Sequence, residues 1–411
     1  PLANGLAHSG ASATPSPTFT PEGLNAVVTA QALNVRNGPG DNFDVIGHLI
    51  QGDVLPILGT DASGFWLLVQ YSQGTLQGWI ATTFTQINGE LTNAPNMQPT
   101  PLPNFVRLDG ITYLRQAFNN CAPTALTMAL TYYGGTDDQM VAASYLRPNT
   151  EQDVSVDISQ MSDYVNLQFP GLRSVWRMGG SWTTLRRLLA AGFPVIIETS
   201  VEVTSGPAPG WAGHNRLLIG YDGDVILTYD SYLGSGNLEG YRVAESTLDE
   251  LWRQMNRQFQ VIYPVEREAE VAYIMGEDWL IPSNIEKSHR VALAEMAANP
   301  SSAFALYNLG TTYVMQGLYT DAAAAYDQAQ AIGLPFRMHW YQFGMLEAYY
   351  NVGRYNEVID ITRRTLNNMG NMATEELYYW LGMATRGAGN MISPSAKWKP
   401  PSPLTPTTNP R

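Results

Sequence analysis

The sequence predicts a multidomain protein with three domains of different class: a small all-β barrel, an α+β domain and an all-α array of helical hairpins. Three observations support this prediction. Residues 24–90 alternate short apolar runs with turns, residues 105–265 place helical patterns before strand patterns, and a glycine recurs every 36 residues near the end of the chain. A chain of 411 residues has room for about two to four domains with their own cores.

The composition excludes several classes of partner. The chain carries 23 lysine and arginine residues against 36 aspartate and glutamate residues, a net charge of −13, and its basic residues do not cluster. Binding of nucleic acid or of an anionic membrane needs a basic surface, so we expect neither partner. No apolar run reaches the length of a transmembrane segment, and a single cysteine excludes an internal disulfide framework.

Three segments rich in proline cannot bury a core: an N-terminal tail at residues 1–23, a linker at 91–104 and a C-terminal tail at 393–411. The Ser/Thr/Pro-rich opening starts at Pro1 and is typical of a processed secreted protein, so we expect an extracellular or cell-surface location. Tails of this composition become ordered when something holds them. The simplest candidate is a neighbouring copy, which makes a homo-oligomer or polymer a hypothesis.

Short apolar runs predict the strands of the first domain, residues 24–90. The runs are residues 24–28, 33–36, 45–49, 54–58, 65–69 and 77–80. The stretches at residues 33–40, 64–66 and 78–80 resemble a bacterial SH3 domain. The resemblance implies binding of cell-wall peptide or packing against a catalytic partner domain. For Trp79 we favour core packing over ligand binding.

Cys121, the only cysteine of the chain, is expected at the N-terminus of a helix. Residues 124–133 are apolar with good helix formers, Pro123 suits a first helical turn, and Gly134-Gly135 would end the helix. At a helix N-terminus the unpaired backbone N–H groups and the helix dipole favour the thiolate over the thiol. The alternative is that Cys121 is a small buried hydrophobe, and this stretch alone supports the two interpretations equally.

Polar side chains precede the cysteine. Asn119 or Asn120 is predicted to cap the helix, and Gln116 can direct its amide N–H at an oxyanion that forms near the sulfur. Downstream, residues 150–167 and 182–191 are predicted to be helical and residues 193–199 to form a buried strand. Residues 203–211 are predicted to be a mobile loop that either lines a substrate cleft or simply crosses the surface.

Of the five histidines, only His214 lies in the same predicted domain as Cys121. A strand that starts at His214, a turn at residues 222–224 and a return strand at 225–230 would form a hairpin with Asp230 near His214. One domain then supplies a nucleophile, a base and an orienting carboxylate. These are the three groups that nucleophilic cysteine catalysis needs.

Other carboxylates and the remaining motifs give weaker signals. Glu198 and Asp222 are also near His214 in sequence, and Asp222 is predicted to be a turn residue because it opens Asp-Gly-Asp. That triplet is too short for a calcium loop, one cysteine with scattered histidines argues against zinc, and no phosphate-binding glycine loop is found. We expect no metal site and no cofactor.

These residues resemble the papain-like cysteine peptidases of the bacteriocin-leader-processing type, within a broad bacterial branch of peptidase-like domains. That family has Gln, four residues, then Cys-Gly-Pro at a helix start, later Gly-His opening a strand and Asp ending the next strand. The matching residues are Gln116, Cys121, Pro123, Gly213, His214 and Asp230. The resemblance covers residues 105–265, and residues 251–264 resemble the closing strand of the family. Ala122 stands where the family has glycine, so a need for a glycine-only conformation there would remove activity.

The resemblance implies a mechanism without a cofactor. Cys121 would attack the carbonyl of a peptide or protein substrate, and His214 would activate the thiol and protonate the leaving amine. Asp230 would orient His214, and Gln116 with the backbone N–H of Cys121 would stabilise the oxyanion.

The last part of the chain is predicted to be helical, with a connector at residues 266–299 and repeats at residues 300–392. Gly317, Gly353 and Gly389 recur at a spacing of 36. The stretches that begin at Asn308 and Ala322 resemble a tetratricopeptide repeat, which implies a surface for protein interaction or self-assembly. Because two and a half repeats are few, we expect the array to lean on the central domain.

The sequence therefore predicts a secreted cysteine peptidase-like protein that hydrolyses peptide or amide bonds. The alternative is an extracellular structural or filament-forming protein, in which the peptidase-like domain is a scaffold and the tails and repeats mediate self-assembly. A third interpretation is a cell-wall-binding adaptor that acts through the SH3-like domain.

Overall fold

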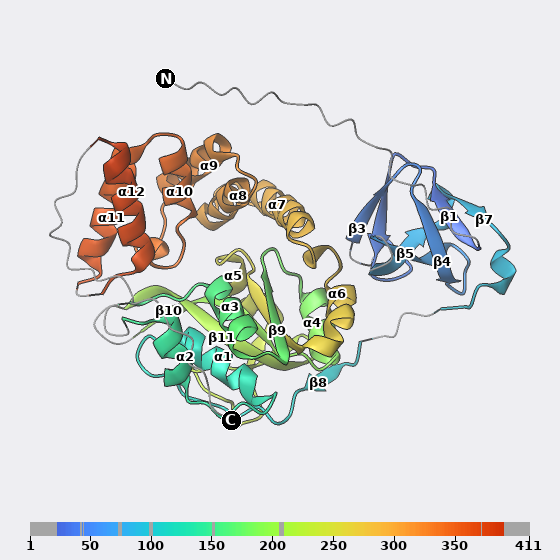
Figure 1. The fold of residues 1–411 in the computed structure, drawn as a ribbon, viewed down its shortest axis with the longest axis horizontal. Helices are drawn as coiled ribbons and strands as arrows, with labels where there is room; N and C mark the ends of the chain where they lie inside the picture. Colours follow the sequence, from blue (N-terminus) through green and yellow to red (C-terminus); the bar gives the residue numbers. More distant parts are fainter. Residues whose placement is uncertain are drawn as a thin grey trace, which may run out of the picture. The chain divides into compact units, whose positions relative to one another are not determined.

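The computed structural model describes residues 23–41, 43, 45–72, 76–97, 102–149, 153–204, 209–370 and 372–389. The chain forms two compact units, Pro1–Thr100 and Pro101–Arg411 (Figure 1). The first is rich in β-strands, and the second contains a central α/β domain and a C-terminal helical region. The tails, for which we hypothesise contact with a neighbouring copy, lie outside the described residues except for Gly23.

Seven strands form an antiparallel sheet in the first unit, in the order β3-β2-β6-β5-β4-β1-β7. They are β1 (Asn25–Val28), β2 (Ala32–Arg36), β3 (Val45–Ile50), β4 (Val54–Thr60), β5 (Trp66–Tyr71), β6 (Leu76–Ala81) and β7 (Thr85–Asn88). Six of them lie where the apolar runs predict strands. The sequence did not predict β7, because Ile87 is its only apolar residue. Trp79 is buried in the core, as predicted.

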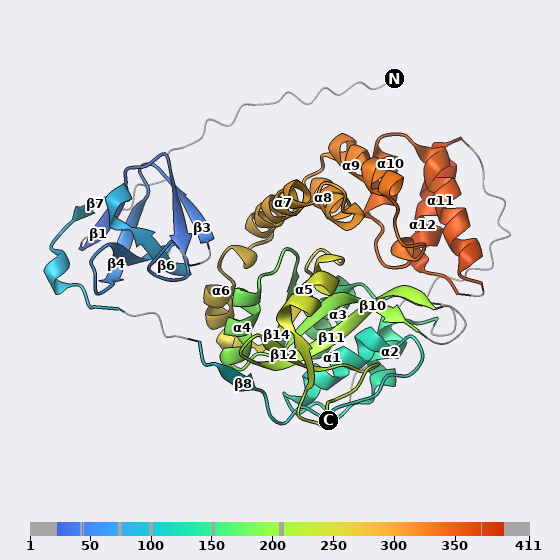
Figure 2. The same ribbon diagram turned by 180° about the vertical axis from the view of Figure 1, so that it is seen from behind.

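The sheet of the second unit is also antiparallel, with the order β13-β12-β11-β10-β14-β9 and with β8 paired to β11. The strands are β8 (Phe105–Arg107), β9 (Leu172–Arg177), β10 (Val195–Val203), β11 (Gly210–Asp222), β12 (Val225–Tyr229), β13 (Tyr241–Ala244) and β14 (Phe259–Pro264). Successive residues of β10 are buried, so both faces of the sheet are covered. Figures 1 and 2 show the helices packed around this sheet.

The predicted hairpin is present, since β11 turns at Gly223 and Asp224 and pairs with β12 from Asp222↔Val225 onward. The loop predicted at residues 203–211 is wrong in extent. Strand pairing between β10 and β11 continues as far as Val203↔Gly210, which extends β11 four residues before His214. His214 is thus held within a paired strand, and not at the end of a loop.

Six helices belong to the α/β domain: α1 (Cys121–Thr131), α2 (Gln139–Leu146), α3 (Ile158–Gln168), α4 (Trp182–Ala190), α5 (Glu245–Arg253) and α6 (Glu268–Met275). Helix α1 begins at Cys121, as predicted. Helix α2 was not predicted from the sequence, and α3 begins at Ile158, later than the predicted start at residue 150. Asp157 ends the preceding extended segment by capping α3, and it forms a capping box with Gln160.

The helical region contains α7 (Ile281–Ala298), α8 (Ala303–Met315), α9 (Tyr319–Ile332), α10 (Gly344–Asn351), α11 (Tyr355–Asn368) and α12 (Glu375–Gly387). Gly317, Gly353 and Gly389 follow α8, α10 and α12 with φ angles of 73°, 80° and 75°. Glycine adopts this left-handed conformation without steric cost, so the recurring glycines end these helices. Among the residues that the structure describes, no helix is long and apolar enough to span a membrane.

The helical region packs on the α/β domain at several places, among them α7, where Asn284 Nδ2 donates a hydrogen bond to the carbonyl oxygen of Met178 (2.8 Å). Two further places involve β11 and Asp153. At the first, Trp211 stacks on Phe304 with ring centroids 6.0 Å apart, and Asn308 Nδ2 donates a hydrogen bond to the carbonyl oxygen of Arg253 (2.6 Å). At the second, Asp153 forms a parallel bridge with Ala373. The expected support of the helical array by the central domain is therefore present.

Candidate active site

Cys121 is the first residue of α1 and is partly exposed. The predicted asparagine cap is wrong, because the side chain of Asn120 makes no capping hydrogen bond. Its Nδ2 instead donates to Gln139 Oε1 (2.7 Å), and its Oδ1 accepts from Arg147 Nη1 (3.3 Å). Arg147 also binds the carbonyl oxygen of Asn119, which has a left-handed φ of 52°. These contacts fix the turn that leads into the cysteine.

His214 and Asp230 are joined by a hydrogen bond of 2.9 Å between Nε2 and Oδ1, and both side chains are buried. The same carboxylate oxygen accepts hydrogen bonds from the backbone N–H groups of Tyr232 (2.9 Å) and Leu233 (2.8 Å). Asp230 is therefore fixed in position, and it fixes the imidazole ring. Because Nε2 faces Asp230, Nδ1 is the ring nitrogen left for Cys121.

Arg216 is a buried residue of the site to which the sequence analysis gave no role. Its Nη1 lies 3.4 Å from Asp230 Oδ2, and its Nε donates to Thr199 Oγ1 (3.0 Å). Arg216 is two residues after His214 on β11, and residues two apart on a strand share a face. The sequence spacing could therefore have predicted that Arg216, like His214, contacts Asp230.

The pKa values of the three groups shift together. Burial alone would raise the pKa of the Cys121 thiol, but the hydrogen bond and charge of His214, helped by Asn215, outweigh burial and lower it. Burial would lower the pKa of His214, but Asp230 and then Cys121 outweigh burial and raise it to about 9. The pKa of Asp230 falls despite burial, because of His214 and Arg216. These directions favour a thiolate–imidazolium pair.

Gln116 is held at the same end of the sheet as Asp230. Ser231 Oγ donates to Gln116 Oε1 (2.8 Å), and the backbone N–H of Gln116 donates to the carbonyl oxygen of Ser231 (3.1 Å). The amide oxygen is thus occupied, and none of the described residues accepts a hydrogen bond from Nε2. That N–H group is open to an acceptor from outside the described residues. Ser231, which follows Asp230 directly, also had no role in the sequence analysis.

A cavity of about 20 Å³ lies beside Cys121. Its walls include Glu198, Gly213 and Asn215 from the sheet, residues 154–156, and Tyr341 from the helical region. The ring of Tyr341 packs so closely on Gly213 that a Cβ atom at this glycine would lie 2.8 Å from Tyr341 Cδ1. The cavity holds about one water molecule, whereas ligand pockets usually measure roughly 300–1,000 Å³. Gly213 of the predicted Gly-His pair thus also allows Tyr341 to pack closely on the strand, a contact that the sequence did not predict.

Ala122 does not require a glycine conformation. It lies in the first turn of α1, it is 3% exposed, and it is absent from the residues with positive φ. The departure from the family pattern at this position therefore does not disturb the backbone at the cysteine.

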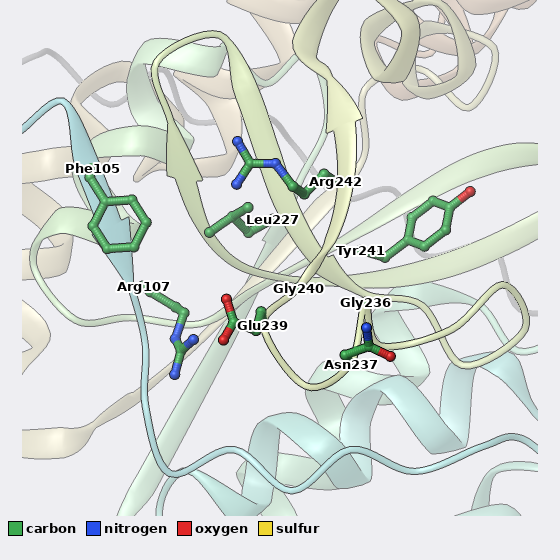
Figure 3. A pocket seen from close by; sticks show the side chains of 9 residues that line it. All are labelled: Phe105, Arg107, Leu227, Gly236, Asn237, Glu239, Gly240, Tyr241 and Arg242. Carbon is green, nitrogen blue, oxygen red and sulfur yellow. The ribbon is translucent and has the colours of Figure 1, made fainter.

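A larger cavity of about 470 Å³ lies beside β8, β12 and β13, away from the predicted site residues (Figure 3). Figure 3 shows Arg107 and Arg242 among the side chains that line it. Both guanidinium groups already pair with carboxylates, Arg107 with Asp109 and Arg242 with Asp222, each at 2.7 Å. Within the described ranges no three His, Cys, Asp or Glu side chains are grouped so that they could hold a metal ion.

Comparisons with known proteins agree with two parts of the sequence prediction. Residues 108–260 match the family described as "Peptidase_C39 like family", and residues 31–86 match the family described as "Bacterial SH3 domain". No curated protein matches the chain.

Three solved structures are similar to part of the chain. A putative C39-like peptidase from Bacillus anthracis is 22% identical, with a TM-score of 0.31, over 39% of this chain and 97% of its own. A double glycine motif protease from an AMS/PCAT transporter, in complex with the leader peptide, is 15% identical, with a TM-score of 0.29, over 39% of this chain and 95% of its own. The peptidase domain of Streptococcus ComA is 12% identical, with a TM-score of 0.27, over 38% of this chain and 96% of its own.

Proposed function

We propose that the chain is a secreted cysteine peptidase that hydrolyses peptide or amide bonds through Cys121, His214 and Asp230. The match of residues 108–260 to the C39-like family supports a peptidase-like function. The observation that carries the mechanism is the buried His214–Asp230 hydrogen bond beside a cysteine at a helix N-terminus, with the pKa of Cys121 lowered and that of His214 raised. A structural cysteine has no need of this arrangement.

The proposed reaction has two halves. The Cys121 thiolate attacks the carbonyl carbon, the carbonyl electron pair moves to oxygen, and the oxyanion accepts hydrogen bonds from Gln116 Nε2 and the Cys121 N–H. The His214 imidazolium then gives its proton to the leaving nitrogen as the C–N bond breaks. In the second half, neutral His214 takes a proton from water, which attacks the thioester and restores the thiolate. Asp230, steadied by Arg216, keeps the ring of His214 in one orientation throughout.

The finer assignments remain predictions. They are the leader-processing branch of the peptidases, the tetratricopeptide-like nature of the helical hairpins, and a cell-wall peptide as the ligand of the SH3-like region. A cell-surface location fits the match of residues 31–86 to bacterial SH3 domains.

The pH dependence of Cys121 alkylation by iodoacetamide tests the proposed pair. A free thiol has a pKa of about 8.5, so it reacts slowly at pH 6, whereas a histidine-paired thiolate reacts rapidly there. We expect fast alkylation of the native chain at pH 6 and at least a tenfold loss in His214→Ala. The variant His48→Ala, which changes a histidine of the other compact unit, should behave like the native chain. An unreactive thiol at pH 6 in the native chain would contradict the proposal.

The small cavity favours a second function, in which the peptidase-like domain is a scaffold of a self-assembling extracellular protein. A cavity of about 20 Å³ does not admit a peptide in this conformation. The scaffold function predicts a mass that grows with concentration in light scattering and a thiol that is unreactive at every pH. A monodisperse monomer at high concentration would count against it.

A further inference from the structure

Glu198 is a buried carboxyl group beside Cys121 that the proposed mechanism does not use. It lies in the middle of β10, it is 7% exposed, and it lines the cavity at the cysteine. None of the described residues forms a hydrogen bond with its carboxyl group. A carboxyl group in a largely buried position without a protein partner favours an occupant of the cavity that pairs with it.

The strand register places Glu198 and His214 on opposite faces of the sheet. Glu198 lies opposite Asn215 in the β10–β11 pairing, and Thr199 lies opposite His214. Since side chains alternate along a strand, Glu198 and Asn215 share one face, and His214 with Thr199 shares the other. The carboxyl group of Glu198 and the imidazole of His214 thus approach Cys121 from different faces of the sheet, and Glu198 is not part of the His214–Asp230 pair.

The electrostatic environment of Glu198 is negative. Burial, Asp157 and Cys121 each raise the pKa of its carboxyl group. The nearby cations are committed elsewhere: His214 is bound to Asp230, and Arg147 donates to the carbonyl oxygens of Asn119 and Asp153. A site where several groups disfavour an added negative charge is one where a cation is stabilised.

We propose that Glu198 determines substrate specificity by receiving a positively charged group, an ammonium or a guanidinium, next to the bond that Cys121 attacks. This inference rests on the proposed peptidase function and names the class of substrate. When the cation enters, it forms an ion pair with the Glu198 carboxylate in the partly dehydrated cavity.

The cavity has to widen to take such a group, because about 20 Å³ holds only a water molecule. The walls formed by β10 and β11 are held by strand pairing. The wall at the start of α1, which includes Asn119 and Cys121, is fixed by the hydrogen bond of Arg147 to the Asn119 carbonyl oxygen. The other walls are residues 154–156, which belong to a connecting segment, and Tyr341 of the helical region. Residues 154–156 and Tyr341 are therefore the walls that have to move when the cavity widens.

The first experiment measures the charge preference of Cys121 without hydrolysis. The full chain is treated with methyl methanethiosulfonate, its 2-aminoethyl cation or its 2-sulfonatoethyl anion. In each case the thiolate attacks the reagent sulfur, a mixed disulfide forms and methanesulfinate leaves. Rate constants are divided by those of a free small thiol. We expect the cation-to-neutral ratio to fall about tenfold in Glu198→Gln, and to remain unchanged in Glu202→Gln, an exposed carboxylate of the same strand.

The native chain provides an independent reading, should the substitution disturb folding. Its cation-to-neutral ratio should exceed one at low salt, and it should persist at 0.5 M salt because a buried carboxylate is screened little. A ratio of one, or an unchanged ratio in a folded Glu198→Gln protein, would overturn the inference.

The second experiment separates this inference from the proposed function. Peptides that carry lysine, or its uncharged isostere norleucine, on either side of the scissile bond are compared by kcat/KM. We expect a lysine preference that Glu198→Gln abolishes while cleavage of the norleucine peptide is kept. Hydrolysis without any charge preference overturns the role of Glu198. No hydrolysis, together with the reagent preference above, overturns the peptidase function and leaves the cation site intact.

Discussion

At the scale of single residues, Asp230 is the most connected group of the site. One carboxylate binds His214, two backbone N–H groups and the charge of Arg216, and it is fully buried. Its position was predictable from the sequence. The two-residue turn between β11 and β12 brings Asp230, which follows the end of β12, near His214 in the first half of β11. Glu198 and Tyr341 were not assigned to the site, since strand register and the docking of a distant helical region decide what they face.

Removal of Arg216 should destabilise the second unit. Arg216→Met removes one of the two cationic groups that pair with the buried Asp230 carboxylate, and losing one partner of a buried pair costs roughly 3–5 kcal/mol of unfolding free energy. Arg242→Met, which breaks the exposed pair with Asp222, should cost about 0–1 kcal/mol. Urea unfolding measures both. Arg216→Met should also raise the pKa of His214 in an NMR titration, whereas an effect on packing alone would leave this titration unmoved.

At the scale of elements, α1 and the β11–β12 hairpin do most to assemble the site. Helical pattern and Pro123 placed the start of α1 correctly, and the Asp-Gly-Asp turn placed the hairpin. The cap was predicted wrongly, because Asn120 is bound by Gln139 of α2 and by Arg147, and α2 itself was missed. Local propensity cannot reveal contacts whose partners come from another element.

Ala122→Gly tests whether the departure from the family pattern matters. Because Ala122 is a regular helical residue, glycine should lower the unfolding free energy by about 0.5–1 kcal/mol through its greater freedom in the unfolded chain. The rate of Cys121 alkylation at pH 6 should stay within twofold. A large gain in hydrolysis with glycine would mean instead that the substrate backbone has to approach this position.

At the scale of the whole molecule, the helical region meets the α/β domain at several places, and the one at Asp153 brings three carboxyl groups together. Asp153, Glu375 and Glu376 line a cavity of about 520 Å³ beside α12. Burial and then Glu375 raise the pKa of Asp153 to about 7, although Arg147 opposes this, and they raise that of Glu376 to about 8. The sequence could predict helices here but not their docking, because three carboxylates in one interface leave no pattern along the chain.

These acids make the docking of α12 depend on pH. Their folded pKa values lie above the unfolded values, so their stabilising contribution is present below about pH 4 and is lost as pH rises through 7 to 8. Glu376→Gln mimics the protonated form and should raise the unfolding free energy by roughly 1–3 kcal/mol at pH 8, and by little at pH 4. Denaturation at the two pH values checks this, with the exposed Glu357→Gln as the control. Equal effects at both pH values would contradict it.

Tyr341 should control access to the cysteine. Tyr341→Ala removes the ring that packs on Gly213, so Cys121 should react faster with a bulky maleimide while its rate with iodoacetamide changes little. Tyr379→Ala, an exposed tyrosine of α12, should change neither rate. If the bulky and the small reagent respond equally to Tyr341→Ala, the ring does not restrict access.

One short segment forms a wall of both cavities: Val154, Ser155 and Val156 border the cavity at Cys121, and Asp153 borders the cavity at α12. A ligand that displaces this segment must therefore alter the proton affinity of Asp153 and Glu376. Thermodynamic reciprocity requires the converse, that proton uptake at α12 alters the affinity at Cys121 by the same factor. Ligand binding at Cys121 would then be accompanied by proton exchange between these carboxyl groups and the buffer. Titration calorimetry in buffers of different ionisation enthalpy would measure the number of protons exchanged.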